Sequence, residues 1–167
     1  MTDLDNKTPE SKDDGDAVNS NAPVQELLSF RVGEQEYSVD IMSVREIRGW
    51  SRATPLPHSA AHVRGVINLR GTVLPIIDLA QRLGLQVEEA SERNVIIVVQ
   101  VRNQTLGLVV DAVSDILSIP MQDLQTPPDL TQDEDNSYVR ALTVVEGRLL
   151  RILDLDAVHP PMESDAA

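Results

Sequence analysis

The stretch from Val63 to Leu79 reads V-R-G-V-I-N-L-R-G-T-V-L-P-I-I-D-L, and it decides the fold. Two apolar, β-branched runs, residues 65–69 and 72–77, flank the pair Arg70-Gly71. Because glycine adopts positive φ without strain, such a pair between two apolar runs predicts a β-hairpin with Arg70 at its tip. No set of catalytic residues is evident in this stretch. We therefore interpret it as a rigid platform that presents one arginine.

The second half of this stretch predicts where a strand ends and a helical turn begins. Pro75 has no backbone donor, which favours an edge position for its strand over a central one. Asp78 is expected to cap a short helical turn that continues through Arg82, and Gly84 is expected to end it. The unit is therefore predicted to be strand, turn, strand and short helix.

Composition restricts the classes of protein to which the chain can belong. Of its 167 residues 41% are hydrophobic but only 2% are aromatic, so Val, Leu and Ile must build the core, which favours strands. A net charge of -13 argues against nucleic acid or an anionic membrane surface as a partner, since either would require a basic face. The chain has no cysteine, and its polar, acidic start does not resemble a signal peptide. We expect a cytoplasmic protein without disulfides or membrane insertion.

The ordered part of the chain is expected to lie between two tails. Residues 1–24 are polar, acidic and without hydrophobic periodicity, so they are predicted to be a disordered acidic tail. Residues 25–159 are predicted to form the folded domain. Residues 160–167 follow two consecutive prolines and are predicted to be a second disordered tail.

Local patterns predict short strands through most of the folded part. Residues 95–99 form an unbroken apolar run, which indicates burial on both faces. Asp40 is expected to cap a short helix, and Ser59 a single turn that ends at Gly65. Residues 119–136, with three prolines and a run of acidic residues, are predicted to be a loop. Besides the organising hairpin, strands are predicted at 27–32, 35–39, 94–102, 105–110, 137–145 and 148–153.

The chain contains an internal repeat. Residues 62–79 align with residues 138–155, with the turn glycine and the Asp-Leu pair of the helical turn both in register. Residues 30–47 align more weakly with residues 99–116. We interpret the repeat as two similar small all-β lobes, because five or so strands with short connections close most economically as a barrel. The alternative is a chance match between two valine-rich hairpins.

The two copies of the repeat differ at the hairpin tip. If the fold alone required the residues at the first tip, both copies should keep them. Asn68 and Arg70 are therefore candidates for a functional role. The differing positions pair as Gly65 with Ala141, Asn68 with Val144, and Arg70 with Glu146.

Residues that could support catalysis or metal binding are few. His58 and His62 have the spacing of zinc ligands on a helix, but without cysteine two histidines on a solvated turn are the simpler interpretation. The eight glycines form no phosphate-binding loop, and most carboxylates lie in solvated runs. We predict no catalytic site, no cofactor and no metal.

Four motifs together resemble the CheW family, the bacterial chemotaxis coupling proteins. The resemblance extends from about residue 25 to residue 159 and keeps the order and spacing of the family's motifs. It implies two intertwined SH3-like five-stranded β-barrel lobes with short helical turns. The motifs are V-R-E-I-R-G-W at 44–50, G-V-I-N-L-R-G at 65–71, P-I-I-D-L at 75–79, and G-L-V-V-D-A-V-S-D-I-L at 107–117.

The resemblance also implies a function and a partner-binding surface. A member of this family is a non-enzymatic adaptor between the cytoplasmic tips of chemoreceptors and the regulatory domain of the histidine kinase CheA, with other CheW-like domains as neighbours in rings. The receptor's helical hairpin lies in the groove between the lobes, and Glu46 and Arg70 are expected to pair. His62 departs from the aromatic or aliphatic residue often found there. The partner-binding positions by motif match are Val44, Glu46, Gly65, Asn68, Arg70 and Gly71.

Two other interpretations compete with a stand-alone adaptor recruited to receptor arrays. The same domain occurs fused to a receiver in CheV and behind a kinase in CheA, but the disordered start and the short end of this chain fit neither fusion. From a different class, the groove between the lobes could be a small-molecule pocket. The shortage of aromatic residues and of convergent polar groups weighs against that function.

Overall fold

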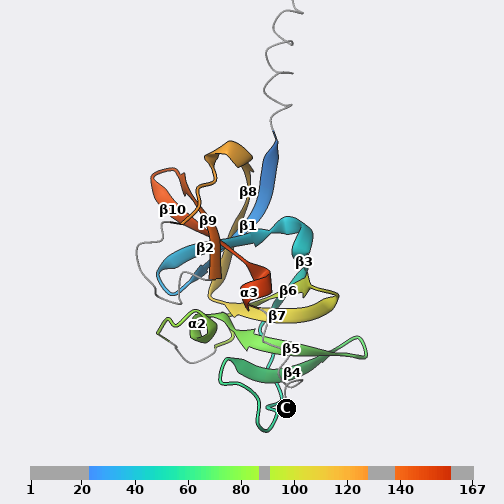
Figure 1. Ribbon diagram of the computed structural model, residues 1–167. Coiled ribbons are helices and arrows are strands. Elements are labelled where there is room, and N and C mark those ends of the chain that lie inside the picture. Colours follow the sequence, from blue (N-terminus) through green and yellow to red (C-terminus); the bar gives the residue numbers. More distant parts are fainter. Residues whose placement is uncertain (1–22, 87–90, 128–137, 159–167) are drawn as a thin grey trace, which may run out of the picture.

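The computed structural model describes residues 23–86, 91–127 and 138–158. Within them, two five-stranded sheets form two lobes, one above the other in Figure 1, and each sheet curves into the expected SH3-like barrel. The upper sheet, in the order β8-β1-β2-β10-β9, contains β1 (Val24–Val32), β2 (Gln35–Asp40), β8 (Ala112–Pro120), β9 (Val139–Val145) and β10 (Arg148–Leu153). The lower sheet, in the order β3-β6-β7-β5-β4, contains β3 (Val44–Gly49), β4 (Val63–Leu69), β5 (Thr72–Asp78), β6 (Val95–Val101) and β7 (Gln104–Val110).

Each lobe combines strands from both halves of the repeat. The upper sheet joins β1 and β2 of the first half to β8, β9 and β10 of the second, and the lower sheet makes the reciprocal combination. Parallel pairs, β2 with β10 and β5 with β7, connect the halves within each sheet. The intertwined fold implied by the resemblance is therefore confirmed. The repeat alone did not indicate which strands share a lobe, because sequence similarity between copies does not show which copies pair.

The hydrophobic core has three parts. A small cluster fills each barrel, and the largest cluster lies where the two sheets face each other. Strand β6 serves two of them, since Ile96 and Val98 point into the lower barrel while Ile97 and Val99 join the shared cluster. This confirms the expected burial of residues 95–99 on both faces for all but the half-buried Val95. The largest part of the core therefore belongs to both lobes together.

The two copies of the sequence repeat also have similar local structure. Strands β4 and β9 have the same length, and the two-residue turns after them have the same left-handed backbone, with φ of 53° and 83° in the first and 50° and 78° in the second. The amide of Asp78 donates to the carbonyl oxygen of His62 at 2.8 Å, and Asp154 donates to Tyr138 at the same distance. Chance alignment of two hairpins does not explain these matches.

Four short helical segments follow aspartate or proline residues in the described part of the chain. The predicted caps are present: the Asp40 carboxylate accepts from the amide of Met42 at 2.9 Å, and the Asp78 carboxylate accepts from the amide of Gln81 at 3.3 Å. These caps precede η1 (Ile41–Ser43), a 3-10 helix, and α2 (Leu79–Arg82). The remaining segments are η2 (Met121–Asp123), which follows Pro120 at the end of β8, and α3 (Leu155–Val158).

Several local predictions need correction. Pro75 lies in β5, which is a central strand, but β5 begins to pair with β7 only at Ile76, so Pro75 faces one neighbouring strand alone. Ser59 donates to the carbonyl oxygen of Leu56 and caps no helix, and strand β4 already begins at Val63.

The expected boundaries of the tail and of the long loop also shift. The first strand of the described residues, β1, already includes Val24, which the sequence analysis placed in the tail. The start of the predicted loop at 119–136 belongs to β8 and η2, because residues up to Pro120 pair with β1. Residues 1–22, 128–137 and 159–167 lie outside the described part of the chain, so the expected disorder of the tails remains a prediction.

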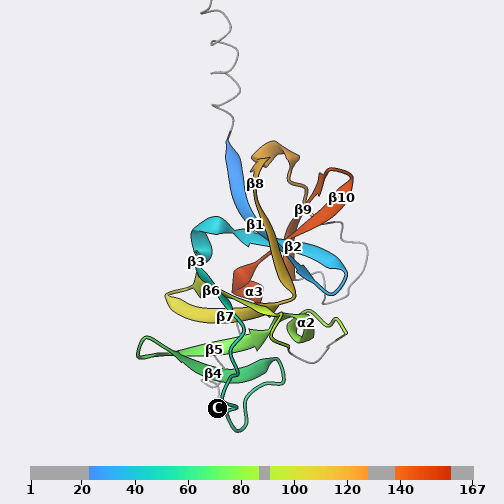
Figure 2. The same ribbon diagram turned by 180° about the vertical axis from the view of Figure 1, so that it is seen from behind.

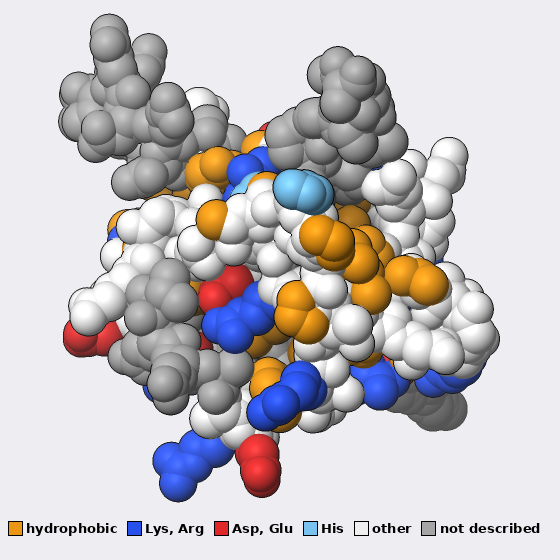
Figure 3. Space-filling model, turned by 90° about the horizontal axis from the view of Figure 1, so that it is seen from below, with side chains coloured by type: hydrophobic (Ala, Val, Ile, Leu, Met, Phe, Trp, Pro, Cys, Tyr) orange, Lys and Arg blue, Asp and Glu red, His pale blue; other side chains and the backbone are white. Residues whose placement is uncertain are grey.

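The connection between β3 and β4 is held against the lower sheet by backbone hydrogen bonds. Thr54 and Val66 exchange two backbone hydrogen bonds of 2.8 and 2.9 Å, so residues 51–58 cover the outer edge of β4. Beyond this contact the connection is exposed, including Leu56. Figure 3 views this end of the molecule and shows hydrophobic side chains gathered beside a histidine.

His62 lies near Arg82, which links α2 to α3. The guanidinium of Arg82 donates to the carbonyl oxygens of Ala157 at 3.2 Å and Val158 at 3.1 Å, and lies over the Tyr138 ring, 5.2 Å from its centroid. The His62 Nε2 atom is buried and has no hydrogen-bond partner among the described residues. Burial first, and then the charge of Arg82, lowers the pKa of His62.

Acidification is therefore expected to destabilise the protein through His62. An unfolded histidine titrates near pH 6.5, whereas folded His62 resists protonation until a lower pH. Between those values the unfolded chain binds more protons, so the stability contributed by neutral His62 is present above about pH 7.5 and is lost as the pH falls through about 6.5. His62→Tyr copies the equivalent Tyr138 and should show a smaller loss. Urea unfolding of both proteins at about pH 7.5 and 5.5 checks this, and equal losses would contradict it.

Candidate functional site

The tip of the β4–β5 hairpin is a two-residue turn with a left-handed backbone. Arg70 has φ of 53° and Gly71 has φ of 83°, and Leu69 pairs with Thr72 directly before and after them. This geometry matches the hairpin turn whose two central residues both need positive φ. The side-chain oxygen of Asn68 accepts a hydrogen bond of 2.8 Å from the amide of Gly71. Asn68 therefore supports the conformation that lifts Arg70 from the sheet.

Arg70 and Glu46 form a two-point ion pair across the lower lobe. The Nη1 atom of Arg70 donates to Oε1 of Glu46 at 2.9 Å, and Nη2 donates to Oε2 at 3.3 Å. The Arg70 side chain is 72% exposed, whereas that of Glu46 is 27% exposed. The hydrogen bond from Arg70 lowers the pKa of Glu46 and raises that of Arg70, so both groups remain charged. The pairing expected from the resemblance is present.

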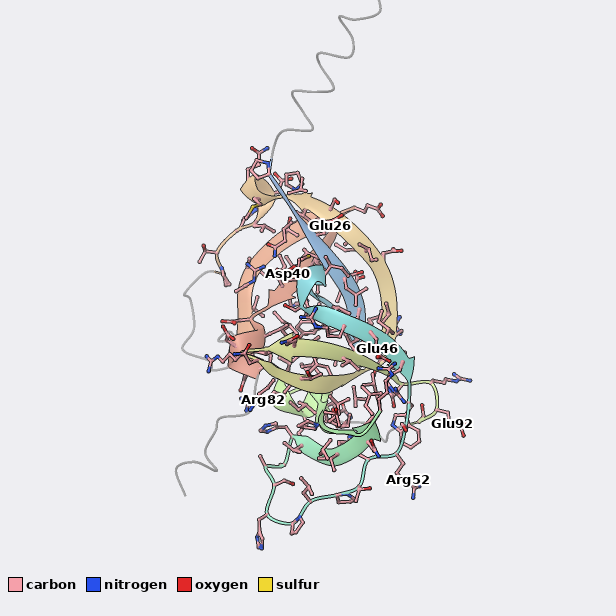
Figure 4. All side chains as sticks on the ribbon, turned by 90° about the vertical axis from the view of Figure 1, so that its right-hand side faces the viewer. Glu26, Asp40, Glu46, Arg52, Arg82 and Glu92 are labelled. Atoms are coloured by element: carbon pink, nitrogen blue, oxygen red, sulfur yellow. The ribbon has the colours of Figure 1, made fainter. Side chains whose placement is uncertain are left out.

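Strand β3 carries Glu46 at the edge of the lower sheet. The pairing of β3 with β6 shifts by one residue between Val44 and Glu46, which indicates a β-bulge at Arg45. After the bulge Glu46 and Arg48 are half-buried on one face, and Ile47 is exposed on the other. Figure 4 shows Glu46 at the β3 edge, on the opposite side of the molecule from Arg82.

The six predicted partner-binding residues do not form one exposed patch. Asn68, Arg70 and Gly71 are exposed at the tip, and Glu46 meets them from β3. Half-buried Val44 lies two residues before Glu46 on the same strand. Gly65 is buried at a bend of β4 with φ of 141°.

Gly65 makes room for the backbone of the covering connection. A β-carbon at this position would lie 2.6 Å from the carbonyl carbon of Thr54 and 2.9 Å from the nitrogen of Pro55, and closer still to the Thr54 oxygen. The glycine is therefore required by a close backbone approach. Its structural role fully explains a glycine at this position.

Sequence reasoning did not identify the residues that line a groove which runs from the upper lobe to the place where the two lobes meet. Two adjoining hollows, with volumes of 590 and 360 Å³, share Asp40 and Arg140 as lining residues. Half of the residues that line the larger hollow are apolar, namely Val24, Ile41, Met42 and Met121. Met42, Val24 and Met121 are 77%, 50% and 49% exposed. The available signal was the apolar pair Ile41-Met42 directly after the capping Asp40.

The second hollow is polar and crosses from one lobe to the other. Its lining comes from the β6–β7 turn of the lower sheet and from β10 and α3 next to the upper one. Figure 4 shows Asp40 where the two lobes meet. Arg102 and Asp156 form an exposed ion pair of 3.1 Å at this end. The groove therefore has one part that exposes apolar side chains among polar ones and one part that is mainly polar, and we call them the apolar half and the charged half.

The remaining features do not suggest enzyme chemistry. A cavity of 230 Å³ holds Arg64 against the buried Asp78, with Nη2 2.6 Å from Oδ2, and this pair fixes the start of α2. Among the described residues there is no group of three or more His, Asp or Glu that could hold a metal. No helix in the part of the chain that the structure describes is long and apolar enough to cross a membrane.

Comparison with known proteins gives one consistent result. The family described as the CheW-like domain matches residues 26–160. The "Chemotaxis protein CheW" of Rhizobium meliloti (strain 1021) is 52% identical over 143 residues, which cover 86% of this chain and 92% of that protein. The protein of the same name from Bacillus subtilis (strain 168) is 31% identical over 143 residues, with coverage of 86% and 92%.

A solved structure agrees with these sequence relatives. The crystal structure of the scaffolding protein TtCheW from Thermoanaerobacter tengcongensis superimposes with a TM-score of 0.74 at 30% identity, covering 79% of this chain and 90% of that one. The intertwined lobes, the arginine-tipped hairpin and these matches lead to one conclusion: the chain belongs to the CheW-like domain family of chemotaxis proteins.

Proposed function

We propose that this chemotaxis adaptor couples chemoreceptors to a CheA-type histidine kinase by binding both, without catalysing a reaction itself. The observation that carries the proposal is the separation of two different surfaces on one rigid fold. One is the groove lined by Asp40, Met42 and Arg140, and the other is the tip around Arg70. Two separate surfaces are what a connector of two partners requires. The protein would act in the cytoplasm, recruited to membrane receptor arrays.

The groove suits the helical tip of a receptor. Its apolar half presents two exposed methionines, whose flexible side chains adapt to the apolar face of a helix. Its charged half carries both signs, with Asp40 and Asp156 beside Arg102 and Arg140, so it can meet the polar residues that flank such a face. This is a helix-in-groove mode of recognition.

The Arg70 tip suits a protein partner with a carboxylate. A guanidinium that is 72% exposed and held by Glu46 is already ordered, so little side-chain entropy is lost when a partner contacts it. Arginine pairs with carboxylates at two points and is frequent among residues that dominate binding energy. The regulatory domain of the kinase, or another CheW-like domain in a ring, would dock here.

Met42→Glu is expected to weaken binding of a receptor cytoplasmic fragment by about tenfold or more, because it places a charge in the apolar half of the groove. Binding of the kinase regulatory domain should change little. The side chain is 77% exposed, so the fold should persist, which the melting temperature checks. Val144→Glu is the matched control, since Val144 is 62% exposed on β9 outside the groove lining. Calorimetry in which both variants bind receptor equally well would refute the groove as the receptor site.

A further inference from the structure

Arg48 has a buried donor that nothing in the described structure satisfies. Its Nε atom is inaccessible to solvent and has no hydrogen-bond partner among the described residues. Its Nη1 atom lies 3.7 Å from Oε2 of Glu46, which is within ion-pair range but too long for a hydrogen bond. A buried donor without a partner is costly and calls for an explanation. Arg48 therefore lies beside an acceptor that it does not fully engage.

Glu46 is placed between two arginines that compete for it. Arg70 takes both of its oxygens, at 2.9 and 3.3 Å, and Arg48 approaches the second oxygen from along the same strand. Arg70 also lowers the pKa of Glu46 more than Arg48 does. In the free protein Glu46 is therefore paired with the exposed Arg70, and the half-buried Arg48 is incompletely paired.

We propose that Glu46 is a two-position switch, in which binding of an acidic partner group to Arg70 transfers Glu46 to Arg48. The partner carboxylate then takes the end of the Arg70 guanidinium that Glu46 occupies in the free protein. Glu46 moves closer to Arg48, whose Nη1 atom already lies within ion-pair range of it. The closer ion pair with Arg48 offsets the loss of the Glu46–Arg70 pair. Arg48 is a positioning residue, since it acts on the partner through Glu46.

The chemistry of the three side chains favours this arrangement. Without Arg48, a carboxylate displaced from Arg70 would remain half-buried and unpaired, which is costly. With Arg48 the carboxylate keeps a cation in both positions. In the free protein the Glu46 carboxylate already accepts the hydrogen bonds of the Arg70 guanidinium. Only a partner with its own carboxylate can therefore displace Glu46 from Arg70 efficiently. The switch therefore selects acidic partner groups over neutral ones. The inference rests on the proposed role of Arg70 in partner binding.

The test is a double-mutant cycle with Arg48→Gln and Glu46→Gln, measured by calorimetry against the kinase regulatory domain and a receptor cytoplasmic fragment. Arg48→Gln is expected to weaken binding of the partner that uses Arg70 by about tenfold, because Glu46 then has nowhere to move. Arg48→Gln combined with Glu46→Gln should recover most of that loss, since no carboxylate then competes for Arg70. Arg45→Gln is the control, because the Arg45 guanidinium donates to the side-chain oxygen of Gln100 and forms no ion pair with Glu46 in the described structure.

A structural role for Arg48 gives a different result. If Arg48 only supported the strand, the double variant would bind as weakly as Arg48→Gln alone, and that outcome overturns the switch. Wild-type affinity of Arg48→Gln also overturns it. Carbon NMR of the Glu46 carboxyl group in free and bound protein gives a second readout, with its pKa expected to change on binding in the wild type. If Arg70→Ala binds both partners with normal affinity, the proposed function of the tip fails. If Arg70→Ala lowers the affinity for a partner and Arg48→Gln does not, only the switch fails.

Discussion

Gly65→Ala is expected to destabilise the protein by about 3–5 kcal/mol, combining the cost of a left-handed backbone at a non-glycine residue with overpacking against fixed atoms. The methyl group would overlap the backbone of Thr54 and Pro55, which cannot turn away as a flexible side chain can. Relief requires the connection to move, and that breaks the two hydrogen bonds between Thr54 and Val66. Urea unfolding monitored by circular dichroism measures the change in the free energy of unfolding.

Gly147→Ala separates the backbone cost from the clash. Gly147 has φ of 78°, and a β-carbon there would meet no atom within 4 Å. Its substitution should cost only about 1 kcal/mol, the penalty for a left-handed residue. If Gly65→Ala proves no more harmful than Gly147→Ala, the close approach of the covering connection is not what the glycine serves. Gly65 would then return as a candidate for direct partner contact.

Arg70→Ala is expected to weaken binding to the kinase regulatory domain or the receptor fragment by about tenfold or more, with almost no change in melting temperature. The side chain is 72% exposed, and its hydrogen bonds to the described residues go to Glu46, so the core does not depend on it. Exposed ion pairs contribute little to stability. A partner that docks on the tip loses its ordered two-point contact. Calorimetry against each partner, with thermal unfolding of the same samples, measures both quantities.

The second hairpin supplies a matched control for Arg70. Glu146 occupies the same turn position with φ of 50°, again followed by a left-handed glycine. Glu146→Ala therefore repeats the backbone change without touching the Glu46 pair, and it should leave binding nearly unaltered. Equal binding by wild type and Arg70→Ala for both partners would show that Arg70 is one more solvated charge on a loop.

Local features of the fold could be predicted from the sequence because they depend on neighbouring residues. The Arg70-Gly71 turn, the caps at Asp40 and Asp78, and the doubly buried run in β6 all follow from short-range chemistry. The pair of Glu46 with Arg70 came from the motif match, and the difference between Arg70 and Glu146 at the two tips pointed to the same place.

Features that depend on distant pairing could not be predicted in this way. The exchange of strands between the two repeats is set by the shared cluster between the sheets, and equivalent segments carry no mark of which copy they pair with. Pro75 was misplaced for the same reason, since its tolerance in a central strand depends on where β7 begins to pair. The groove was missed because its lining residues come from elements that are far apart in the sequence.

The central claim is that this one chain joins a receptor to a kinase by contact. Its most direct test is co-sedimentation of the kinase with clustered receptor cytoplasmic fragments, with and without this protein. A separate sample of the protein alone with ATP checks for turnover. The account predicts that the kinase sediments in stoichiometric amounts only when the protein is present, and that Arg70→Ala or Met42→Glu reduces its recovery. Equal recovery of the kinase with and without the protein would contradict the account.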